Sequence, residues 1–240
     1  MPAFHCFEHS ITPEAKEWTI GPEESHHLVK VLRAKPEDTV YLLNGKGLRL
    51  KSRLVSANPK AAQVEILSKE EISEDAPQLC LAVGIPKPKT IETIIRQATE
   101  MGISEIQLLN AVRSEVPRNF FNSTEKLEKL QRVAQEACKQ SENPFLPEIH
   151  MNQTMADWLK DFHEPGAHWV AHPTRNSKPS SPTSAIQQRK HWLLIGPEGG
   201  LTDTEYKLAR EKGFHPLNLG ATILRVDTAC VAICAQARRG

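Results

Sequence analysis

The segment that decides the fold is Leu193-Leu-Ile-Gly-Pro-Glu-Gly-Gly-Leu201, in which an apolar run leads into a glycine-rich loop. Thr202-Asp-Thr-Glu205 follows with the Thr-x-x-Glu spacing of a capping box, which predicts a helix that continues to Gly213. A strand, a glycine-rich loop and a capped helix are typical of α/β sheets, whose ligands bind beyond the carboxyl ends of the strands. The loop is neither a P-loop nor a GxGxxG fingerprint, so these residues alone indicate either a ligand loop of unspecified kind or a tight turn.

Strands and helices alternate along the chain on both sides of this segment. Apolar strands are expected at 79–83, 106–109, 168–171, 192–195 and 217–219. Helices are expected at 90–101, 123–140, 202–213 and at the C-terminal end, where Asp227 is the expected cap. A loop rich in Ser, Pro and Lys is expected at 176–183. The alternation predicts an open, largely parallel α/β sheet.

The first 70 residues are instead expected to be rich in β-structure. Asn44-Gly-Lys-Gly47 is a hairpin turn between an apolar strand at 39–43 and an alternating strand at 48–55, and a further strand is expected at 63–67. Ser25 is the expected N-cap of a short helix at 26–33. Residues 69–77 are acidic and end in proline, so we expect a linker there, with one domain over 1–70 and a second over 75–240.

The composition indicates a cytoplasmic protein with free thiols. The 240 residues are 39% hydrophobic and 25% charged, with a net charge of +1. No apolar run approaches the roughly 18 residues of a membrane span, and the first ten residues lack the pattern of a signal peptide. Five cysteines without a CxxC indicate free thiols and no metal, although Cys230 and Cys234 lie one helical turn apart and could face one.

A second motif, Leu219-Gly-Ala-Thr-Ile-Leu-Arg-Val-Asp-Thr-Ala229, follows the glycine-rich loop after about one helix and one strand. Arg225 lies between an apolar pair and the start of a helix of small residues. A cation beside a ligand loop can hold an anion or polarise a base carbonyl. The alternative is a surface ion pair of Arg225 with Asp227, which would contribute little to stability.

The two motifs together resemble the cofactor signature of the RsmE family, the 16S rRNA (uracil-N3) methyltransferases of the SPOUT superfamily. Ala98-Thr-Glu-Met-Gly-Ile103, Arg113-Ser114 and Val31-Leu-Arg33 are also similar to the family, in the same order along the chain. The chain departs from the family in three segments: Glu142-Asn143 stand where glycine and arginine are usual, Thr222 where an arginine is frequent, and His5-Cys-Phe7 where Arg-Phe-Phe is usual. The first two departures remove cations that could contact RNA.

The resemblance implies a fold, a cofactor and an assembly. The expected fold is a SPOUT α/β trefoil-knot domain with a parallel sheet, preceded by a small PUA-like β-barrel domain, in a homodimer. The implied cofactor is S-adenosyl-L-methionine, and no metal is needed because the cofactor carries the activated methyl group. The implied cofactor-binding residues are Ile195, Gly196, Pro197, Gly199, Gly200, Leu219, Gly220, Ile223 and Leu224.

Methylation of N3 of a uracil requires a base for the N3 proton and a cation near O2 and O4. We expect Arg225 to supply the cation, with help from Arg113. Glu198 is the candidate base or positioning group, and it could equally cap the following helix.

The implied partner is 16S rRNA in the small (30S) ribosomal subunit, and its contact is expected in the first domain. Residues 30–53 carry seven cations against two carboxylates, and clustered cations neutralise phosphates. The candidate RNA-binding residues are His26, Lys30, Arg33, Arg49, Lys51 and Arg53. The alternative is an ordinary solvated strand face.

Two other functions remain open at this point. The same fold could methylate another RNA target, for example a ribose 2′-hydroxyl. The chain could also be a non-catalytic RNA-binding protein of ribosome assembly.

Overall fold

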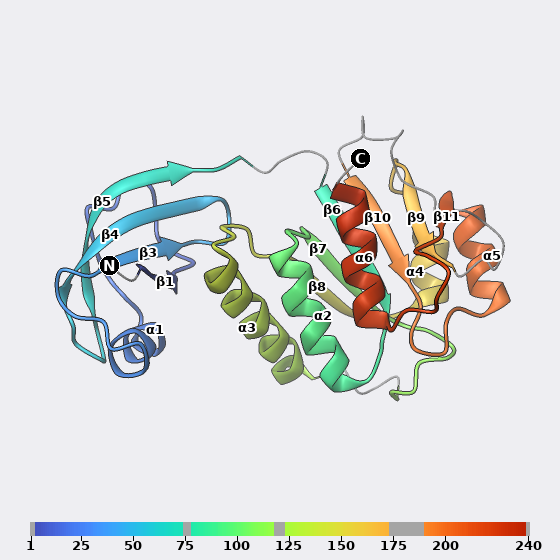
Figure 1. The fold of residues 1–240 in the computed structure, drawn as a ribbon, viewed down its shortest axis with the longest axis horizontal. Helices are drawn as coiled ribbons and strands as arrows, with labels where there is room; N and C mark the ends of the chain where they lie inside the picture. The colour runs from blue at the N-terminus through green and yellow to red at the C-terminus, as the bar shows by residue number, and fades with distance from the viewer. Residues whose placement is uncertain (1–2, 74–77, 118–122, 173–189, 239–240) are drawn as a thin grey trace. The chain divides into compact units, whose positions relative to one another are not determined.

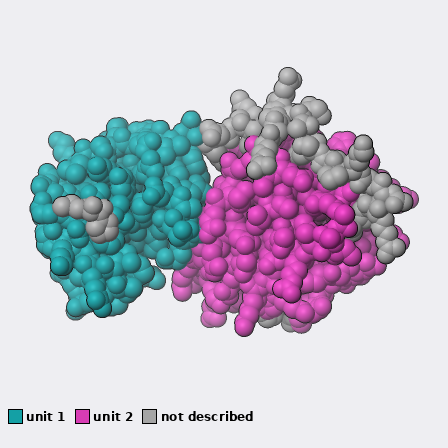
Figure 2. Space-filling view, viewed as in Figure 1, with its two compact units in different colours: residues 1–74, 135–146 teal, residues 75–134, 147–240 magenta. Residues whose placement is uncertain are grey.

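The computed structural model describes residues 3–73, 78–117, 123–172 and 190–238, and these form two compact units. The first comprises residues 1–74 with 135–146, and the second comprises 75–134 with 147–240 (Figure 2). Residues 135–146, expected in the second domain, therefore group with the first unit. The domain limits of 1–70 and 75–240 stay a prediction. The loop expected at 176–183 lies outside the described residues.

The first unit is built on one five-stranded sheet in the order β1-β3-β4-β5-β2 (Figure 1). Its strands are β1 (Ala3–Phe7), β2 (Glu17–Thr19), β3 (Thr39–Leu43), β4 (Leu48–Ser56) and β5 (Gln63–Glu71). The predicted alternation of β4 is confirmed, since Leu48, Leu50 and Leu54 are buried and the residues between Leu48 and Leu54 are alternately more exposed. β5 extends into the expected linker because Glu70 pairs across the sheet with Arg49.

The short helix of this unit begins earlier than expected. α1 spans Pro22–His26 and continues into a π-helical turn, η1, at His27–Val31. The prediction of Ser25 as N-cap is wrong, because Pro22 presets the helical φ of the first turn after Gly21. Ser25 is buried instead, where its hydroxyl donates to Ile20 O and accepts from Ala62 N, both at 2.9 Å.

The second unit contains a six-stranded, fully parallel sheet in the order β11-β9-β10-β6-β7-β8. Its strands are β6 (Gln78–Gly84), β7 (Glu105–Asn110), β8 (Glu148–Thr154), β9 (His168–Ala171), β10 (Lys190–Ile195) and β11 (Phe214–Leu217). The predicted parallel α/β sheet is thereby confirmed. β8 was not anticipated, and the last strand precedes its expected position at 217–219.

Five helices follow β6 in the described part of the chain, and the end of one of them, α3, groups with the first unit. They are α2 (Pro88–Glu100), α3 (Thr124–Ser141), α4 (Met155–Asp161), α5 (Asp203–Glu211) and α6 (Val226–Arg238). α2 packs against α6 on one face of the sheet, and α4 packs against α5 (Figure 1). Asp227 lies inside the first turn of α6, so the expectation that it caps the helix is wrong. None of the helices in the described ranges has the length and hydropathy of a membrane span.

The trefoil knot implied by the resemblance stays a prediction, because the connection from β9 to β10 includes residues 173–189, which lie outside the described residues. The central strands β6 and β10 are almost completely buried, from Leu79 to Val83 and from His191 to Ile195. Their burial gives the loops that follow them a rigid base.

Candidate active site

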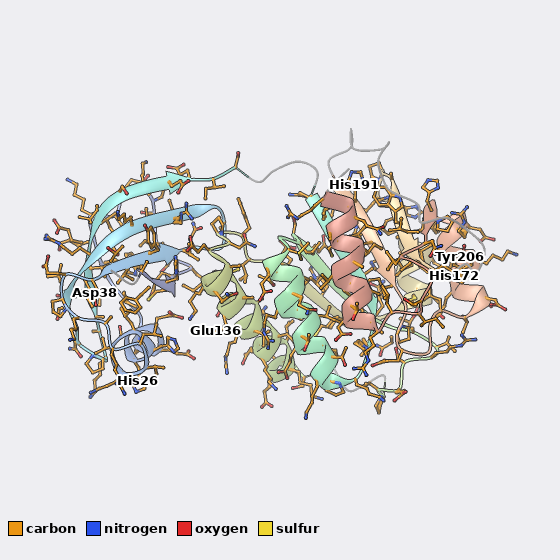
Figure 3. The ribbon with its side chains drawn as sticks, viewed as in Figure 1. His26, Asp38, Glu136, His172, His191 and Tyr206 are labelled. Carbon is orange, nitrogen blue, oxygen red and sulfur yellow. The ribbon has the colours of Figure 1, made fainter. Side chains whose placement is uncertain are left out.

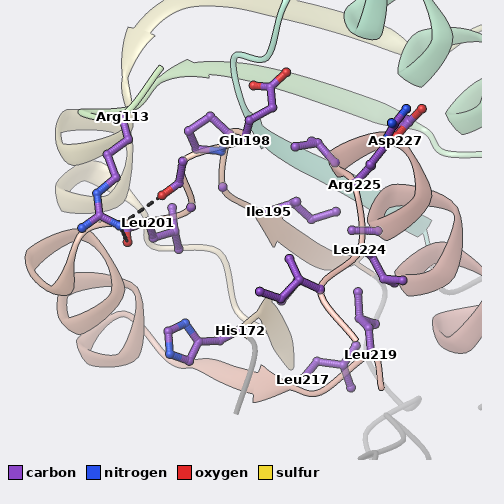
Figure 4. A pocket seen from close by; sticks show the side chains of 18 of the residues that line it. Arg113, His172, Ile195, Glu198, Leu201, Leu217, Leu219, Leu224, Arg225 and Asp227 are labelled. Atoms are coloured by element: carbon purple, nitrogen blue, oxygen red, sulfur yellow. Dashed lines mark hydrogen bonds between the residues drawn. The ribbon is translucent and has the colours of Figure 1, made fainter. Parts of the chain in front are cut away.

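A cavity of about 810 Å³ lies beyond the carboxyl ends of β9, β10 and β11, all within the second unit (Figure 4). Two segments form most of its wall: the glycine loop (residues 196–201) after β10, and the arginine loop (residues 219–227) before and into α6. All predicted cofactor-binding and catalytic residues line it. These are Arg113, Ile195, Gly196, Pro197, Glu198, Gly199, Gly200, Leu219, Gly220, Ile223, Leu224 and Arg225.

The glycine loop needs glycine for steric reasons. A Cβ atom on Gly196 would lie 2.8 Å from Leu201 N, closer than real Cβ contacts allow. Gly200 has a φ of +69°, in the left-handed region where side chains are strained. Gly84, at the end of β6, packs so tightly that its Cβ would lie 2.5 Å from Pro197 Cδ. The loop is therefore tightly packed, and larger residues at Gly84 and Gly196 would displace it.

Arg113 follows β7 and fastens the glycine loop from outside. Its Nη1 atom donates to Gly199 O at 3.1 Å and to Leu201 O at 3.2 Å (Figure 4). The guanidinium is thus already bound to main-chain carbonyls. This geometry favours a positioning role for Arg113 over the expected direct help to Arg225.

Glu205 connects the start of α5 to the loop after β7, next to Arg113. The sequence did not predict this contact. The predicted capping box is confirmed, with Thr202 as N-cap of α5 and Glu205 as its partner. The Glu205 carboxylate is also buried, and its Oε1 accepts a hydrogen bond from Val112 N at 2.9 Å. One side chain therefore joins the start of α5 to the loop that carries Arg113.

Glu198, the candidate base or positioning group and alternative cap of α5, bonds to the start of another helix. Its Oε1 accepts from Lys87 N at 3.1 Å, and Lys87 is the N-cap residue of α2. α5 is capped instead by Thr202, so the alternative of a cap on the following helix is wrong. The side chain is exposed, and its Oε2 has no hydrogen-bond partner among the described residues.

Arg225 is exposed at the cavity wall, between Leu224 and Val226 (Figure 4). Within the described ranges its guanidinium has no ion pair, and Asp227 is not paired with it. The alternative of a surface ion pair is thus not supported. A cation without a partner at a cavity wall is available to an anion or a polarised carbonyl.

His172 is a cavity residue that the sequence did not single out. It follows β9, and its ring stacks on Tyr206 of α5 with centroids 4.0 Å apart (Figure 3). Burial lowers the pKa of His172, and the nearby Asp203 opposes this only in part. A neutral imidazole can accept a proton. A lone histidine after a strand carries no local signal that could have identified it.

Cys230 and Cys234, which could have faced a metal, both lie in α6. No group of three or more metal-ligating side chains is present in the part of the chain that the structure describes. Cys230 and Cys234 are buried in α6, and burial raises the pKa of the Cys234 thiol to about 12. Both thiols therefore stay protonated, which disfavours metal binding.

The candidate RNA-binding residues lie in the first unit, where the structure separates them into two sets. Arg49 pairs with Glu70 and with Glu142, the latter at 3.7 Å. Arg53 pairs with Glu37 at 3.1 Å and with Glu65. The exposed set has no ion pair in the described ranges and comprises His26, Lys30, Arg33 and Lys51.

Two family models match the chain. An RNA methyltransferase domain matches residues 73–238, and an RNA methyltransferase PUA domain matches residues 20–67. Among curated relatives, ribosomal RNA small subunit methyltransferase E of Synechocystis sp. is 33% identical over 91% of this chain and 71% of the relative. The protein of the same name from Bacillus subtilis is 29% identical over 90% of this chain and 87% of the relative.

Solved structures share the fold. A structure from Legionella pneumophila, described as a methyltransferase in complex with the cofactor SAM, has a TM-score of 0.88. It is 24% identical, and the match covers 100% of this chain and 98% of that one. Ribosomal RNA small subunit methyltransferase E from Neisseria gonorrhoeae, bound to S-adenosyl methionine, has a TM-score of 0.81 at 25% identity over 100% and 97%. The predicted fold class, a SPOUT-type α/β domain after a PUA-like domain, is confirmed. The chain belongs to the ribosomal RNA small subunit methyltransferase E family.

Proposed function

We propose that this protein transfers a methyl group from S-adenosylmethionine to N3 of one uridine in small-subunit ribosomal RNA. The observation that carries the proposal is the single cavity wall formed by the glycine loop and the arginine loop, the two segments that resemble the family's cofactor signature. The names of the relatives support an rRNA substrate, and the cofactor of the Neisseria structure supports S-adenosylmethionine. The choice of N3 rests on the resemblance.

The residues present fit this cofactor. The cavity is large enough for a nucleoside-sized ligand, and Gly196 and Gly200 both line it without a side chain. Leu217, Leu219 and Leu224 provide an apolar surface that suits an adenine ring. When bound, S-adenosylmethionine supplies a methyl group activated by its sulfonium.

Arg225 acts in this proposal as the cation for the target base. As the N3 proton leaves, negative charge spreads over O2 and O4 of the uracil, and a preorganised guanidinium stabilises that charge. Its lack of a carboxylate partner in the described ranges keeps its charge available. Arg113 positions the glycine loop through Gly199 O and Leu201 O.

Glu198 is the proposed acceptor of the N3 proton. Its Oε1 is held by Lys87 N, which orients the carboxylate and leaves Oε2 for the proton. The N3–H bond breaks and its proton passes to Oε2, so that the electron pair left on N3 can accept the methyl group, which the cofactor would release with cleavage of its carbon–sulfur bond. His172 lines the same cavity as a neutral imidazole and is the alternative acceptor.

The first unit is the proposed RNA-binding part. N3 lies on the Watson–Crick edge, so the target uridine must be unpaired or extruded when it reacts. A homodimer in the cytoplasm is part of the proposal and rests on the family resemblance.

The test is methylation of unmodified small ribosomal subunits by the purified protein with S-adenosylmethionine, followed by nucleoside mass spectrometry. The expected result is 3-methyluridine at one mapped position, absent with the Arg225→Ala variant. A methylated ribose would instead establish the other RNA target. Tight cofactor and subunit binding without any methylation would favour an assembly factor.

A further inference from the structure

The cations of the first unit differ in whether a carboxylate already neutralises them. On β4, Arg49 and Arg53 each pair with two glutamates. In the 30–35 segment, Lys30, Arg33 and Lys35 are exposed and have no ion pair among the described residues. A cation that must first leave a carboxylate gains less from a phosphate than a cation that is free. Lys51 on β4 is also exposed and has no ion pair in the described ranges, but three such cations lie together within the six residues of the 30–35 segment.

The same segment exposes two large apolar side chains. Val31 is 58% exposed and Leu32 is 40% exposed, at the end of η1. Exposed aliphatic side chains that lie between cations are unfavourable in water unless a partner covers them. Flat, apolar base faces beside phosphates match this arrangement, because aliphatic side chains can insert against unstacked bases.

The segment is held in one conformation by its own backbone. Leu32 N donates to His27 O at 2.9 Å, and Ala34 N donates to Leu28 O at 3.0 Å. Lys35 N donates to Asp38 Oδ2 at 2.7 Å. Figure 3 labels Asp38 and also His26, which lies in the helix before the segment. Arg33 has a φ of +59°, and the next residue, Ala34, is buried. Such preorganisation lowers the entropy lost on binding.

From these observations we propose that the 30–35 segment is the principal RNA contact of the first unit. Lys30, Arg33 and Lys35 hold phosphates, and Val31 with Leu32 packs against unpaired bases. The paired arginines of β4 serve the sheet instead of the RNA. The inference rests on the proposed function for its choice of RNA as the partner, and it selects among the cations that the sequence could not rank.

The test compares three variants of the full chain for binding to a protein-free transcript of small-subunit RNA at several salt concentrations. The first variant removes the free cations, as Lys30→Gln, Arg33→Asn and Lys35→Gln, with asparagine chosen because it tolerates positive φ. The second, Val31→Ser with Leu32→Ser, removes the apolar pair. The matched control, Arg49→Gln with Arg53→Gln, removes the paired cations.

Loss of three phosphate contacts should weaken binding and reduce the slope of log affinity against log salt by about 2. The serine variant should weaken binding and leave the slope unchanged, and the matched control should retain both. All changed residues of the segment are exposed, so melting temperatures should stay at the wild-type value. Equal losses for the control and the first variant would overturn the proposal, as would unchanged binding of the first variant.

The proposed function is tested in a separate assay, which measures formation of 3-methyluridine by the wild-type protein on small ribosomal subunits. Wild-type RNA binding that depends on the 30–35 segment, without 3-methyluridine, would uphold this inference and refute the methylation. If the wild-type protein methylates the subunits but its RNA binding does not depend on the 30–35 segment, the proposed function is upheld and this inference is refuted. No binding of the transcript by the wild type would overturn the inference.

Discussion

Glu205→Ala should destabilise the second unit far more than removal of an ordinary, exposed glutamate from the first turn of a helix would. The buried carboxylate accepts three hydrogen bonds, from Val112 N at 2.9 Å, Thr202 N at 2.8 Å and Thr202 Oγ1 at 2.7 Å. Loss of the hydrogen bonds from Thr202 to the carboxylate costs about 1 kcal/mol, and leaving the part-buried Val112 N unpaired costs about 1–3 kcal/mol. A total of about 3 kcal/mol lowers the melting temperature of a domain of this size by roughly 6–12 °C.

The assay is thermal unfolding followed by tryptophan fluorescence, because three of the four tryptophans, Trp158, Trp169 and Trp192, lie in the second unit. Thr202→Ala is the matched control. It removes the cap hydroxyl and leaves Val112 N paired with Glu205, so it should lower the melting temperature by only roughly 2–4 °C.

Cofactor affinity provides the second readout for Glu205→Ala. Without the hydrogen bond to Val112 N, the loop that carries Arg113 is held less firmly. Arg113 then positions the glycine loop less well, so binding of S-adenosylmethionine should weaken. Equal melting temperatures for Glu205→Ala and Thr202→Ala would refute the reasoning, because the link to Val112 would then contribute nothing.

Three further predictions follow from the site and the core. Arg225→Ala should lower methyl transfer by about 10²–10³ while calorimetry finds cofactor binding largely kept, and near-normal turnover would discard its assignment. Gly84→Ala should weaken cofactor binding, because its Cβ would lie 2.5 Å from Pro197 Cδ, and an unchanged dissociation constant would count against that contact. Burial lowers the pKa of His168 below its ordinary 6.5, so the folded state binds fewer protons and stability should be lost as pH falls below 6.5. His168→Asn should flatten this dependence in melting experiments, and an unaltered slope would assign it to other groups.

Local patterns predicted much of the framework correctly. The period-two alternation of Leu48, Leu50 and Leu54 placed the buried face of β4, because successive side chains of any strand point to opposite faces. Thr202 and Glu205 placed the start of α5, because a capping box involves residues three apart. The apolar runs of β6 and β10 indicated buried parallel strands.

The same patterns failed where a nearby alternative competed. Ser25 has the side chain of an N-cap, yet Pro22 starts the helix earlier and a tertiary contact with Ala62 takes the hydroxyl. Residues 135–141 continue the helix α3 (Thr124–Ser141), yet they group with the first unit. There Lys139 is buried and pairs with Glu24 at 2.7 Å. Helical periodicity cannot report which unit a helix end joins.

The sequence by itself determined the alternation of most strands and helices of the second unit, the glycine loop and the arginine loop, since each is encoded by residues a few positions apart. It missed β1, β2, β8 and α4. Only the tertiary structure decided what the functional side chains do. Glu198 meets Lys87, Arg113 meets Gly199, and Glu205 meets Val112, across 86 to 111 residues of the chain. Likewise, Arg49 is neutralised by Glu70 and Glu142, which strand periodicity cannot reveal. Charge and hydrogen-bond state depend on distance in space, and chain folding alone brings these groups within that distance.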